Sequence, residues 1–572
     1  MASLQSVRSN GRIYWRIVES RRVNGKPRPV PIAYLGRSAD LLARLQAADS
    51  LRVRSVSHGA VAALFSLSQE LDVAGAIDRY LSEHGRRLRP SQVRRNESTA
   101  PQKRDGLTVG QSLVLVAIGR ACHATSKRGF AEWAGTTSLG ELAAAPIELL
   151  SSQHFWDQMD QLPLKAVASV EREVVARALE RLEPTAGTML YDATNFFTFI
   201  ASTNKRPELP ARGHNKQKRD DLRQVGVALL ASRSHGIPLW HQTYGGQVAD
   251  ASLFSEVLPS IRQRLNDLKL DPGALTLVYD KGNVSRANQK LVDESKCHYV
   301  AAMPASSQRE LVAEANSRLE SVVLPGGEAV MTYRTRRILW GADRTAVVLV
   351  SERLREGQMR GVLQHVASAK IWLSSLSQTL RRGKQKRDRA RIERDIETRL
   401  HGRQQLSKVL RFELKGSGRK LQLTYRFDRR VFDRLARDVF GRLLLITDHE
   451  PWSTEEIVTA YRGQAEIEAI FAHLKDPVHL ALRPQFHWTD QKLHVHVLTC
   501  LLGYLLERML FLRAKAIGYS GSMERLLDTL EKVRRVTVIR QATDSAKPRL
   551  TTQLEDADSE VLRLMEALKI AA

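Results

Sequence analysis

The spacing of hydrophobic and polar residues divides the chain into regions that favour different secondary structure. Two short extended runs, 14–19 and 29–35, lie on either side of Asn24-Gly25, a dipeptide typical of two-residue turns, so we expect an N-terminal β-hairpin. From about residue 55 to 185 the apolar residues recur at helical spacing. A polar break at 86–104 carries seven basic residues against one acid, which predicts an exposed loop that is either a solvated linker or a DNA contact.

From about residue 186 the pattern changes to strands that alternate with helices. The expected elements, in chain order, are strands at 189–197, 225–230 and 237–244, a helix at 251–265, a strand at 275–280, a helix at 285–292 and a strand at 298–303. Three strands, a helix, a strand, a helix and a strand is the order of an RNase H-like core. By periodicity alone, other mixed α/β folds fit the same order.

The pattern is interrupted between about 306 and 440. Strand pairs are expected at 329–351 and 411–427, with a long charged helix at about 358–400 between them. We interpret this region as an insertion domain that folds as a separate unit, with a sheet formed by its own hairpins. The core then resumes with a strand at 443–446.

Charge indicates the kind of partner. Lys plus Arg number 88 and Asp plus Glu 62, which leaves a net charge of +26 and a pI near 10.2. Such an excess favours a polyanion, although composition alone does not separate DNA from RNA or from an anionic membrane. The longest apolar run, 497–506, is ten residues, whereas a membrane span needs about 20, so we expect a buried core helix and no membrane partner.

Cysteine usage and the first residues indicate the compartment. The three cysteines are widely separated, which is typical of reduced core thiols and predicts no CxxC metal site. The N-terminal segment has no apolar signal region, so we expect a cytoplasmic protein.

These patterns predict an α/β protein whose RNase H-like catalytic core is interrupted by a mixed α+β insertion and preceded by a helical domain. The expected segments are an N-terminal hairpin (1–45), a helical DNA-binding domain (46–185), a first core part (186–305), the insertion (306–440), a second core part (441–515) and a C-terminal helical region (516–572).

Two aspartates occur in the expected core strands. Asp192 lies inside the apolar run 190–194, and Asp280 ends the run 275–280. Aspartate is disfavoured in strands, so each position needs a reason. One reason is metal-dependent phosphoryl chemistry, because two divalent cations about 4 Å apart take carboxylate ligands from several elements and stabilise both reacting oxygens. The alternative is a strand-end aspartate that caps the following turn.

The third candidate acid is Glu468. Ser453 and Glu456 form an S-x-x-E capping box that predicts a helix start, and the helix continues to a stop before Pro477. At 100° per residue, one sector of this helix about 60° wide contains Tyr461, Gln464, Glu468 and Lys475. Glu468 therefore lies at the edge of the buried face, where an acid needs a positive partner. The alternative is a surface glutamate, and Gly463 could bend the helix start.

These residues resemble a known motif. The spacing Tyr461-x2-Gln464-x3-Glu468-x6-Lys475 resembles the Y-x2-R-x3-E-x6-K motif of the IS4-like DDE transposases, and the surrounding phrases are most similar to the IS1634 branch. Further similar segments are Leu190-Tyr-Asp-Ala-Thr194, Val278-Tyr-Asp-Lys-Gly282, Gly213-His-Asn-Lys216, Gly236-Ile-Pro238, Gly25-Lys-Pro27 and Tyr34-Leu-Gly36. The resemblance covers about residues 12 to 515. Gln464 departs from it, because glutamine brings no charge to a phosphate contact.

The resemblance implies a mechanism. Asp192, Asp280 and Glu468 would bind two Mg²⁺ ions, for which Mn²⁺ could substitute, and the enzyme would cleave the element's ends and join the freed 3′-hydroxyls to target DNA. Its partner would be double-stranded DNA, held in a homodimeric complex. Expected DNA contacts are Tyr461, Arg462, Gln464, Lys475, Lys216, Lys218, Arg219 and Arg223, with a solvated loop as the alternative for the last four.

Two other functions stay open at this point. An RNase H-like nuclease without strand transfer would share the same metal site. A domesticated DNA-binding protein without catalysis is disfavoured, because all three acids are present. A basic RNA-binding protein fits less well, since aromatic residues are 6% of the chain and no RNP-type aromatic motif occurs.

Overall fold

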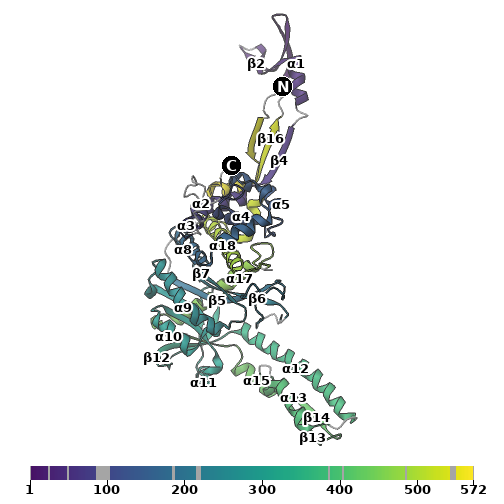
Figure 1. Ribbon diagram of the computed structural model, residues 1–572. Helices are drawn as coiled ribbons and strands as arrows, with labels where there is room; N and C mark the ends of the chain where they lie inside the picture. The colour runs from purple at the N-terminus through teal and green to yellow at the C-terminus, as the bar shows by residue number, and fades with distance from the viewer. Residues whose placement is uncertain are drawn as a thin grey trace, which may run out of the picture. The chain divides into compact units, whose positions relative to one another are not determined.

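The computed structural model of the chain describes residues 2–23, 26–47, 51–84, 103–182, 187–213, 215, 219, 221–383, 387–401, 405–482, 486–540 and 549–570. The fold divides into two compact units. One unit contains residues 1–174, 474–482 and 491–572, and the other contains 175–473 and 483–490. Each unit is described below by itself (Figure 1).

The first unit begins with a three-stranded antiparallel sheet. Its strands are β1 (Ala2–Ser9), β2 (Arg12–Val23) and β3 (Lys26–Arg37), and helix α1 (Ser38–Ala47) follows. Val23 is the register partner of Lys26, so the expected N-terminal hairpin is confirmed, although the turn at Asn24 and Gly25 lies outside the described residues. Strand β1 was not expected, because its sequence has no clear alternation.

Helices form the larger part of the first unit. They are α2 (Gly59–Glu70), α3 (Val73–His84), α4 (Val109–Cys122), α5 (Phe130–Gly135), α6 (Leu139–Leu142), α7 (Ser152–Gln161), α8 (Leu164–Leu179), α18 (Asp490–Ala516), α19 (Met523–Glu531) and α20 (Ser559–Ala567). Helix α18 packs closely on α4, since a Cβ on Gly503 would lie 2.9 Å from the Ala117 carbonyl oxygen. Most of the polar break, 85–102, lies outside the described residues.

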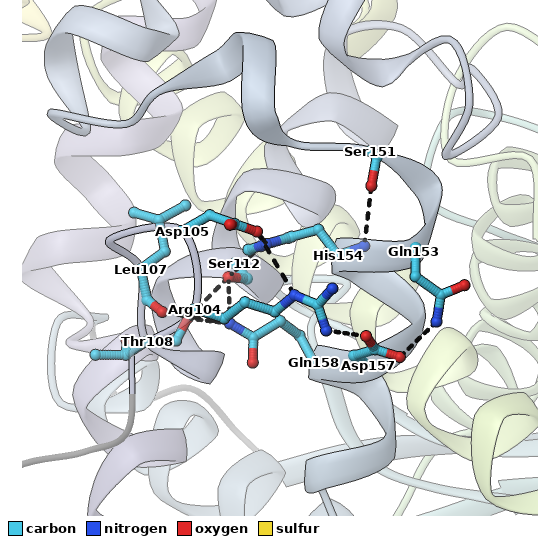
Figure 2. A network of polar contacts seen from close by, with 10 residues as sticks. All are labelled: Arg104, Asp105, Leu107, Thr108, Ser112, Ser151, Gln153, His154, Asp157 and Gln158. Carbon is cyan, nitrogen blue, oxygen red and sulfur yellow. Dashed lines mark hydrogen bonds and ion pairs between the residues drawn. The ribbon is translucent and has the colours of Figure 1, made fainter.

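A buried polar network fixes the chain where it enters α4 (Figure 2). The His154 ring bonds Asp105 at 2.8 Å and Ser112 Oγ at 3.0 Å, and Arg104 pairs with Asp157. The hydrogen bonds connect the side chains in the order serine, histidine and aspartate, as in the catalytic triad of a hydrolase. However, Ser112 and His154 are fully buried, and Ser112 Oγ donates to the Thr108 carbonyl at 2.8 Å, so this network is a structural clamp between α4 and α7.

Helix α18 contains the long apolar run. By length and composition it could span a membrane, as could the bent α2–α3 pair taken together, but 83% of its most apolar window is buried within the fold. The expectation of a buried core helix is therefore confirmed. Cys122, Cys297 and Cys500 are all free and buried, as expected.

A second three-stranded sheet joins distant parts of the first unit. Strand β16 (Arg534–Arg540) lies between β4 (Leu51–Ser57) and β17 (Arg549–Leu554), and both pairings are antiparallel. The C-terminal region was expected to be helical, so its two strands correct that prediction. The physical reason is the run Val536-Thr-Val-Ile539, whose β-branched residues favour a strand.

The second unit is built on a nine-stranded mixed sheet. The strand order is β10-β11-β12-β15-β9-β8-β5-β6-β7. The bounds are β5 (Gly187–Thr198), β6 (Arg223–Ser232), β7 (Pro238–Gly245), β8 (Leu275–Tyr279), β9 (His298–Met303), β10 (Glu320–Val323), β11 (Ala329–Leu339), β12 (Ala342–Val350) and β15 (Arg442–Thr447). Helices α9 (Asp250–Asp267), α10 (Arg286–Glu294) and α11 (Arg309–Asn316) connect them, so the expected order of elements between 187 and 303 is confirmed.

The boundary expected for the insertion is wrong. Strands β10, β11 and β12 extend the main sheet, and β12 pairs with β15 from Thr345 to Val350. The physical reason lies in the run Ala346-Val-Val-Leu349, which is fully buried and apolar on both faces, as in an interior strand. The inserted unit therefore comprises the elements between Glu352 and Asp438.

Within this insertion, helix α12 (Glu352–Arg381) leads from the sheet to a small cluster of elements (Figure 1). The cluster consists of α13 (Arg389–His401), α14 (Leu406–Val409), the hairpin β13 (Leu410–Lys415) and β14 (Gln422–Phe427), and α15 (Arg429–Asp438). Its apolar core joins Leu373 of α12, Ile396 of α13 and Phe432 of α15. The second expected hairpin is confirmed as a separate two-stranded sheet.

Candidate active site

Two neighbouring parallel strands bring two of the candidate acids together. Tyr191 of β5 and Tyr279 of β8 are register partners, and each is followed directly by an aspartate, Asp192 and Asp280. Because adjacent strands are about 4.8 Å apart, the two aspartates lie side by side, although 88 residues separate them in sequence. Both side chains are half-buried.

The two aspartates face away from helix α9. The rings of Tyr191 and Tyr279 contact Phe254 of α9, with centroids 4.8 Å and 4.9 Å away. Successive side chains of a strand point to opposite faces, so Asp192 and Asp280 lie on the other face of the sheet. Helix α16 (Thr454–Arg462) approaches on that face, since Tyr461 contacts Asp280.

Helix α16 starts as the sequence predicts. The Ser453 side chain accepts from the Glu456 backbone N–H, and the Glu456 carboxylate accepts from the Ser453 backbone N–H, which completes the capping box. Gly463 interrupts the helix, and α17 (Gln464–Lys475) begins at the next residue. A Cβ at Gly463 would lie 2.7 Å from Arg233 Nε and 2.9 Å from the Ala460 carbonyl oxygen, so this close approach requires glycine.

The Tyr461 hydroxyl is the point that the three acids share. It donates a hydrogen bond to Asp280 Oδ1 at 3.0 Å. Burial raises the pKa of Tyr461, and the negative charges of Asp280, Glu468 and Asp192 raise that pKa further. All three carboxylates are therefore close enough to act on one phenol, although 188 residues of sequence separate Asp280 from Glu468.

Gln464 has a role that the sequence did not reveal. Its Nε2 donates to the Val278 carbonyl oxygen at 2.8 Å and to the Tyr191 carbonyl oxygen at 3.4 Å. Gln464 thus joins α17 to both parallel strands, beside the two aspartates. Its neutral amide suits these backbone acceptors. The motif resemblance had indicated only a weakened phosphate contact for this residue.

Glu468 lies one helical turn after Gln464 on α17, and its side chain is exposed. Within the described part of the chain, no lysine or arginine forms an ion pair with Glu468 or Asp280. Asp280 and Glu468 are thus near Asp192 without a cationic partner of their own among the described residues. A cation bound here would lower the mutual repulsion of the acids.

The chemical type of the three carboxylates favours metal binding, but their spacing does not match a formed metal site. Carboxylate oxygens are the ligands that Mg²⁺ prefers, so the chemistry of Asp192, Asp280 and Glu468 fits such an ion. Among the described residues, however, no group of three or more His, Cys, Asp or Glu side chains is already gathered at ligand spacing. The acids fit an oxygen-bound cation after side-chain adjustment, which the exposed Glu468 permits.

Several expected DNA contacts are engaged within the protein. Arg462 makes a bidentate ion pair with Glu328 at 2.6 Å and 2.8 Å, and this contact lowers the pKa of Glu328. Arg223 donates to the carbonyl oxygens of Ile200 and Ala201 at 3.0 Å and 2.6 Å. These two arginines fix loops of the fold, and their contact with phosphate stays a prediction.

The remaining expected contacts stay predictions. Arg219 is exposed and pairs with Asp221 at 2.8 Å. Lys216 and Lys218 lie outside the described residues. Lys475 is the last residue of α17 and belongs to the first unit.

Comparison with known proteins adds few relatives. No sequence-family model matches the chain, and no curated protein matches its sequence. Among solved structures, the chain is similar to a piggyBac transposase in a synaptic complex with hairpin DNA, at 10% identity and a TM-score of 0.38, over 82% of this chain and 78% of that one. It is also similar to the Mos1 transposase in a paired-end complex with the left transposon end, at 10% identity and a TM-score of 0.15, over 36% of this chain and 62% of that one.

Proposed function

We propose that this chain is a DNA transposase of an insertion sequence, with an RNase H-like core and a metal-dependent DDE mechanism. The observation that carries the proposal is the placement of Asp192 and Asp280 side by side on neighbouring strands, with Tyr461 bonded to Asp280 and Glu468 on the helix that follows. Three acids from two strands and one helix suit phosphoryl transfer, in which a site mainly positions groups and stabilises charge. From the motif spacing we further propose that the chain is IS4-like, most similar to the IS1634 branch.

The metal ions belong to the same proposal. Asp192, Asp280 and Glu468 would hold two Mg²⁺ ions, or Mn²⁺ in their place, which would activate the attacking water and stabilise the leaving 3′ oxygen. The protein's own contribution is to position these acids. Gln464 fixes the two strands against α17, and Tyr461 holds Asp280 through a hydrogen bond at 3.0 Å.

Double-stranded DNA is the proposed partner, and the net charge of +26 supports a polyanion. We place the protein in the bacterial cytoplasm and on the nucleoid, as a homodimer when it binds two transposon ends. In the DNA complex, Lys475 would hold a terminal phosphate as a point charge.

The experiment uses a plasmid that carries the native element ends, incubated with the full chain and Mg²⁺. We expect cleavage at the ends and joining of the freed 3′-hydroxyls to a second plasmid. The variants D192N, D280N and E468Q should each lose at least about a thousandfold of the cleavage rate, because each removes one metal ligand. The matched control is E466Q, which removes an exposed carboxylate from the same helix.

The outcome also separates the competing functions. Cleavage without joining would identify a nuclease rather than a transposase. If the wild type binds the ends but neither cleaves nor joins them in Mg²⁺ or Mn²⁺, the protein is a DNA-binding protein and the proposal is wrong.

A further inference from the structure

The sheet formed by β4, β16 and β17 has an unusual composition. Its three strands contain 20 residues, of which six are arginine and none is aspartate or glutamate. The strands come from residues 51–57 and 534–554, so the C-terminal region completes a structure that neither segment forms alone. A dense positive charge without local acids favours a polyanionic partner.

The strand register separates the two faces of this sheet. On one face, Arg54 is level with Thr537 and Thr552, and the row next to it on that face contains Arg52, Ile539 and Leu550. On the other face, Val53 is level with Val538 and Thr551, and Ser57 is level with Arg534, which pairs with Glu555 at 3.8 Å. We call the first of these surfaces the arginine face.

The arginine face is open to solvent. Arg52, Arg54 and Thr552 are exposed, and Leu550 is 64% exposed. Within the described part of the chain neither Arg52 nor Arg54 has an ion-pair partner, whereas Arg535, at the base of the sheet, pairs with Glu141 at 3.2 Å. The Thr537 and Thr552 hydroxyls are 3.4 Å apart, so the face also presents hydrogen-bonding groups beside Arg54.

We propose that the arginine face of this sheet binds double-stranded DNA through the phosphate backbone. Arg52 and Arg54 are two residues apart on one strand, which places them about 6.6 Å apart along it. The outer strands are about 10 Å apart, comparable to the 12 Å width of the major groove, so the sheet can lie over that groove while its arginines reach phosphates. A β-sheet is an established way for a protein to meet a duplex groove.

This inference deepens the proposed function and relies on its DNA partner, but it concerns binding and not the metal site. The test therefore uses a duplex of arbitrary sequence and about 30 base pairs, which is long enough for one DNA-binding module. EDTA is present, so that cleavage plays no part. Loss of the cleavage activity proposed above would leave this result unchanged. A negative result here would in turn leave the carboxylate site untouched.

The first variant is R52A/R54A, measured across a salt series. Each lost phosphate contact should lower the slope of log affinity against log salt by about one unit, so the slope should fall by about two. The control is K165A/R563A, which removes two exposed cations from other elements of the same unit and makes the same change in net charge. An unchanged slope for R52A/R54A, with the circular-dichroism melt of the wild type, overturns the proposal.

A second pair of variants tests the face itself. T552D and T551D add the same charge at neighbouring exposed positions of β17, but only Thr552 lies on the arginine face. We expect T552D to weaken duplex binding about tenfold and T551D to change it less than about twofold, because phosphate repulsion acts at short range in salt. Equal effects of the two variants contradict the proposed face.

Two further readouts keep the test decisive if a variant fails to fold. In the wild type, the duplex should slow hydrogen exchange at 51–57 and 549–554, and absence of that protection overturns the proposal. Light scattering of R52A/R54A should match the wild type. A change from dimer to monomer, without a change in DNA affinity, would mean that the sheet joins two copies of the chain instead.

Discussion

The Tyr461 hydroxyl donates a hydrogen bond to Asp280 Oδ1 at 3.0 Å, across 181 residues of sequence. This bond connects helix α16 with the end of strand β8 and places a neutral donor among three acids. Tyr461 therefore reports directly on the charge state of the proposed metal site.

The first prediction concerns the titration of Tyr461. Burial and the three carboxylates raise its pKa above the ordinary 10, so the phenol should stay protonated when exposed tyrosines ionise. Because the folded pKa is raised, its contribution to stability is complete below about pH 10 and is lost as the pH rises further. An ultraviolet titration of the wild type minus that of Y461F should show no phenolate near pH 10.

Added Mg²⁺ gives the control for that titration. A cation between the acids offsets their charge and should lower the pKa of Tyr461. If Mg²⁺ leaves the Tyr461 titration unchanged at saturating concentration, no cation binds beside this phenol.

The second prediction concerns Gln464. Q464A leaves the Val278 and Tyr191 carbonyls without their side-chain donor, so we expect a loss of about 1 kcal/mol in the free energy of unfolding. In Q464E a carboxylate faces the same two carbonyl oxygens without a hydrogen to donate, and it adds a fourth negative charge to the site. The free energy of unfolding should therefore fall by about 2 kcal/mol or more. Urea unfolding measures both variants, with E466Q as the control on the same helix. Equal stability of Q464E and the wild type would contradict the role of Gln464 as a link between α17 and the strands.

The third prediction concerns His449, which follows β15. Its Nε2 lies 2.7 Å from Thr276 Oγ1, and its ring stacks on Trp452 at 3.7 Å. Burial, and then the charge of His298, lower the pKa of His449 to about 4. Because the unfolded residue takes up a proton near pH 6.5, this contribution to stability is complete above pH 6.5 and is lost as the pH falls towards 4.

The measurement is urea unfolding at pH 7 and at pH 4.5. The wild type should lose about 2 kcal/mol more than H449Q between these two conditions, since the variant has no group to protonate. H401Q is the control, because His401 is exposed on α13 and lies outside the His449 contacts. A loss as large in H449Q as in the wild type would assign the pH effect to other groups.

The fourth prediction concerns the far end of the insertion. Arg381, Arg382 and Arg387 are exposed, and the Arg387 backbone N–H donates to the Gly418 carbonyl oxygen at 3.3 Å. This contact places the exposed Arg419 beside them, at the tip of the β13–β14 hairpin. Lys384 and Lys386, which belong to the same basic segment, lie outside the described residues.

Replacing Arg381, Arg382, Lys384, Lys386 and Arg387 by alanine should weaken binding of an element-end duplex and lower its salt slope by several units. Arg429, which pairs with Asp433 at 2.9 Å, supplies the control variant R429A. A salt slope equal to that of the wild type would mean that this cluster is a solvated surface.

The sequence was most informative where periodicity and local chemistry agreed. The capping box at Ser453 and Glu456, the two-residue turn after Val23 and the strand–helix order of the core all depend on neighbouring residues, so local rules suffice. The sequence also placed Asp192 and Asp280 in or at the end of strands. It could not show that their strands are neighbours, because pairing is a long-range property.

The features that the sequence did not predict have the same cause. The run Ala346-Val-Val-Leu349 indicates a buried strand, but nothing local shows that it joins β15 rather than a separate sheet. Strands β4 and β16 are about 480 residues apart in the chain (534 − 51 = 483). No local stretch of sequence could therefore predict the sheet that carries the arginine face. Gln464 was missed because its partners are backbone carbonyls, which every residue carries.

The central claim is that Asp192, Asp280 and Glu468 form one metal site, and electron paramagnetic resonance of Mn²⁺ binding tests it most directly. The wild type should bind two ions per chain at this site, and D192N, D280N and E468Q should each lose at least one, whereas E466Q should keep both. Equal Mn²⁺ stoichiometry and affinity in all five proteins would contradict the account, because the ions would then bind without these three carboxylates.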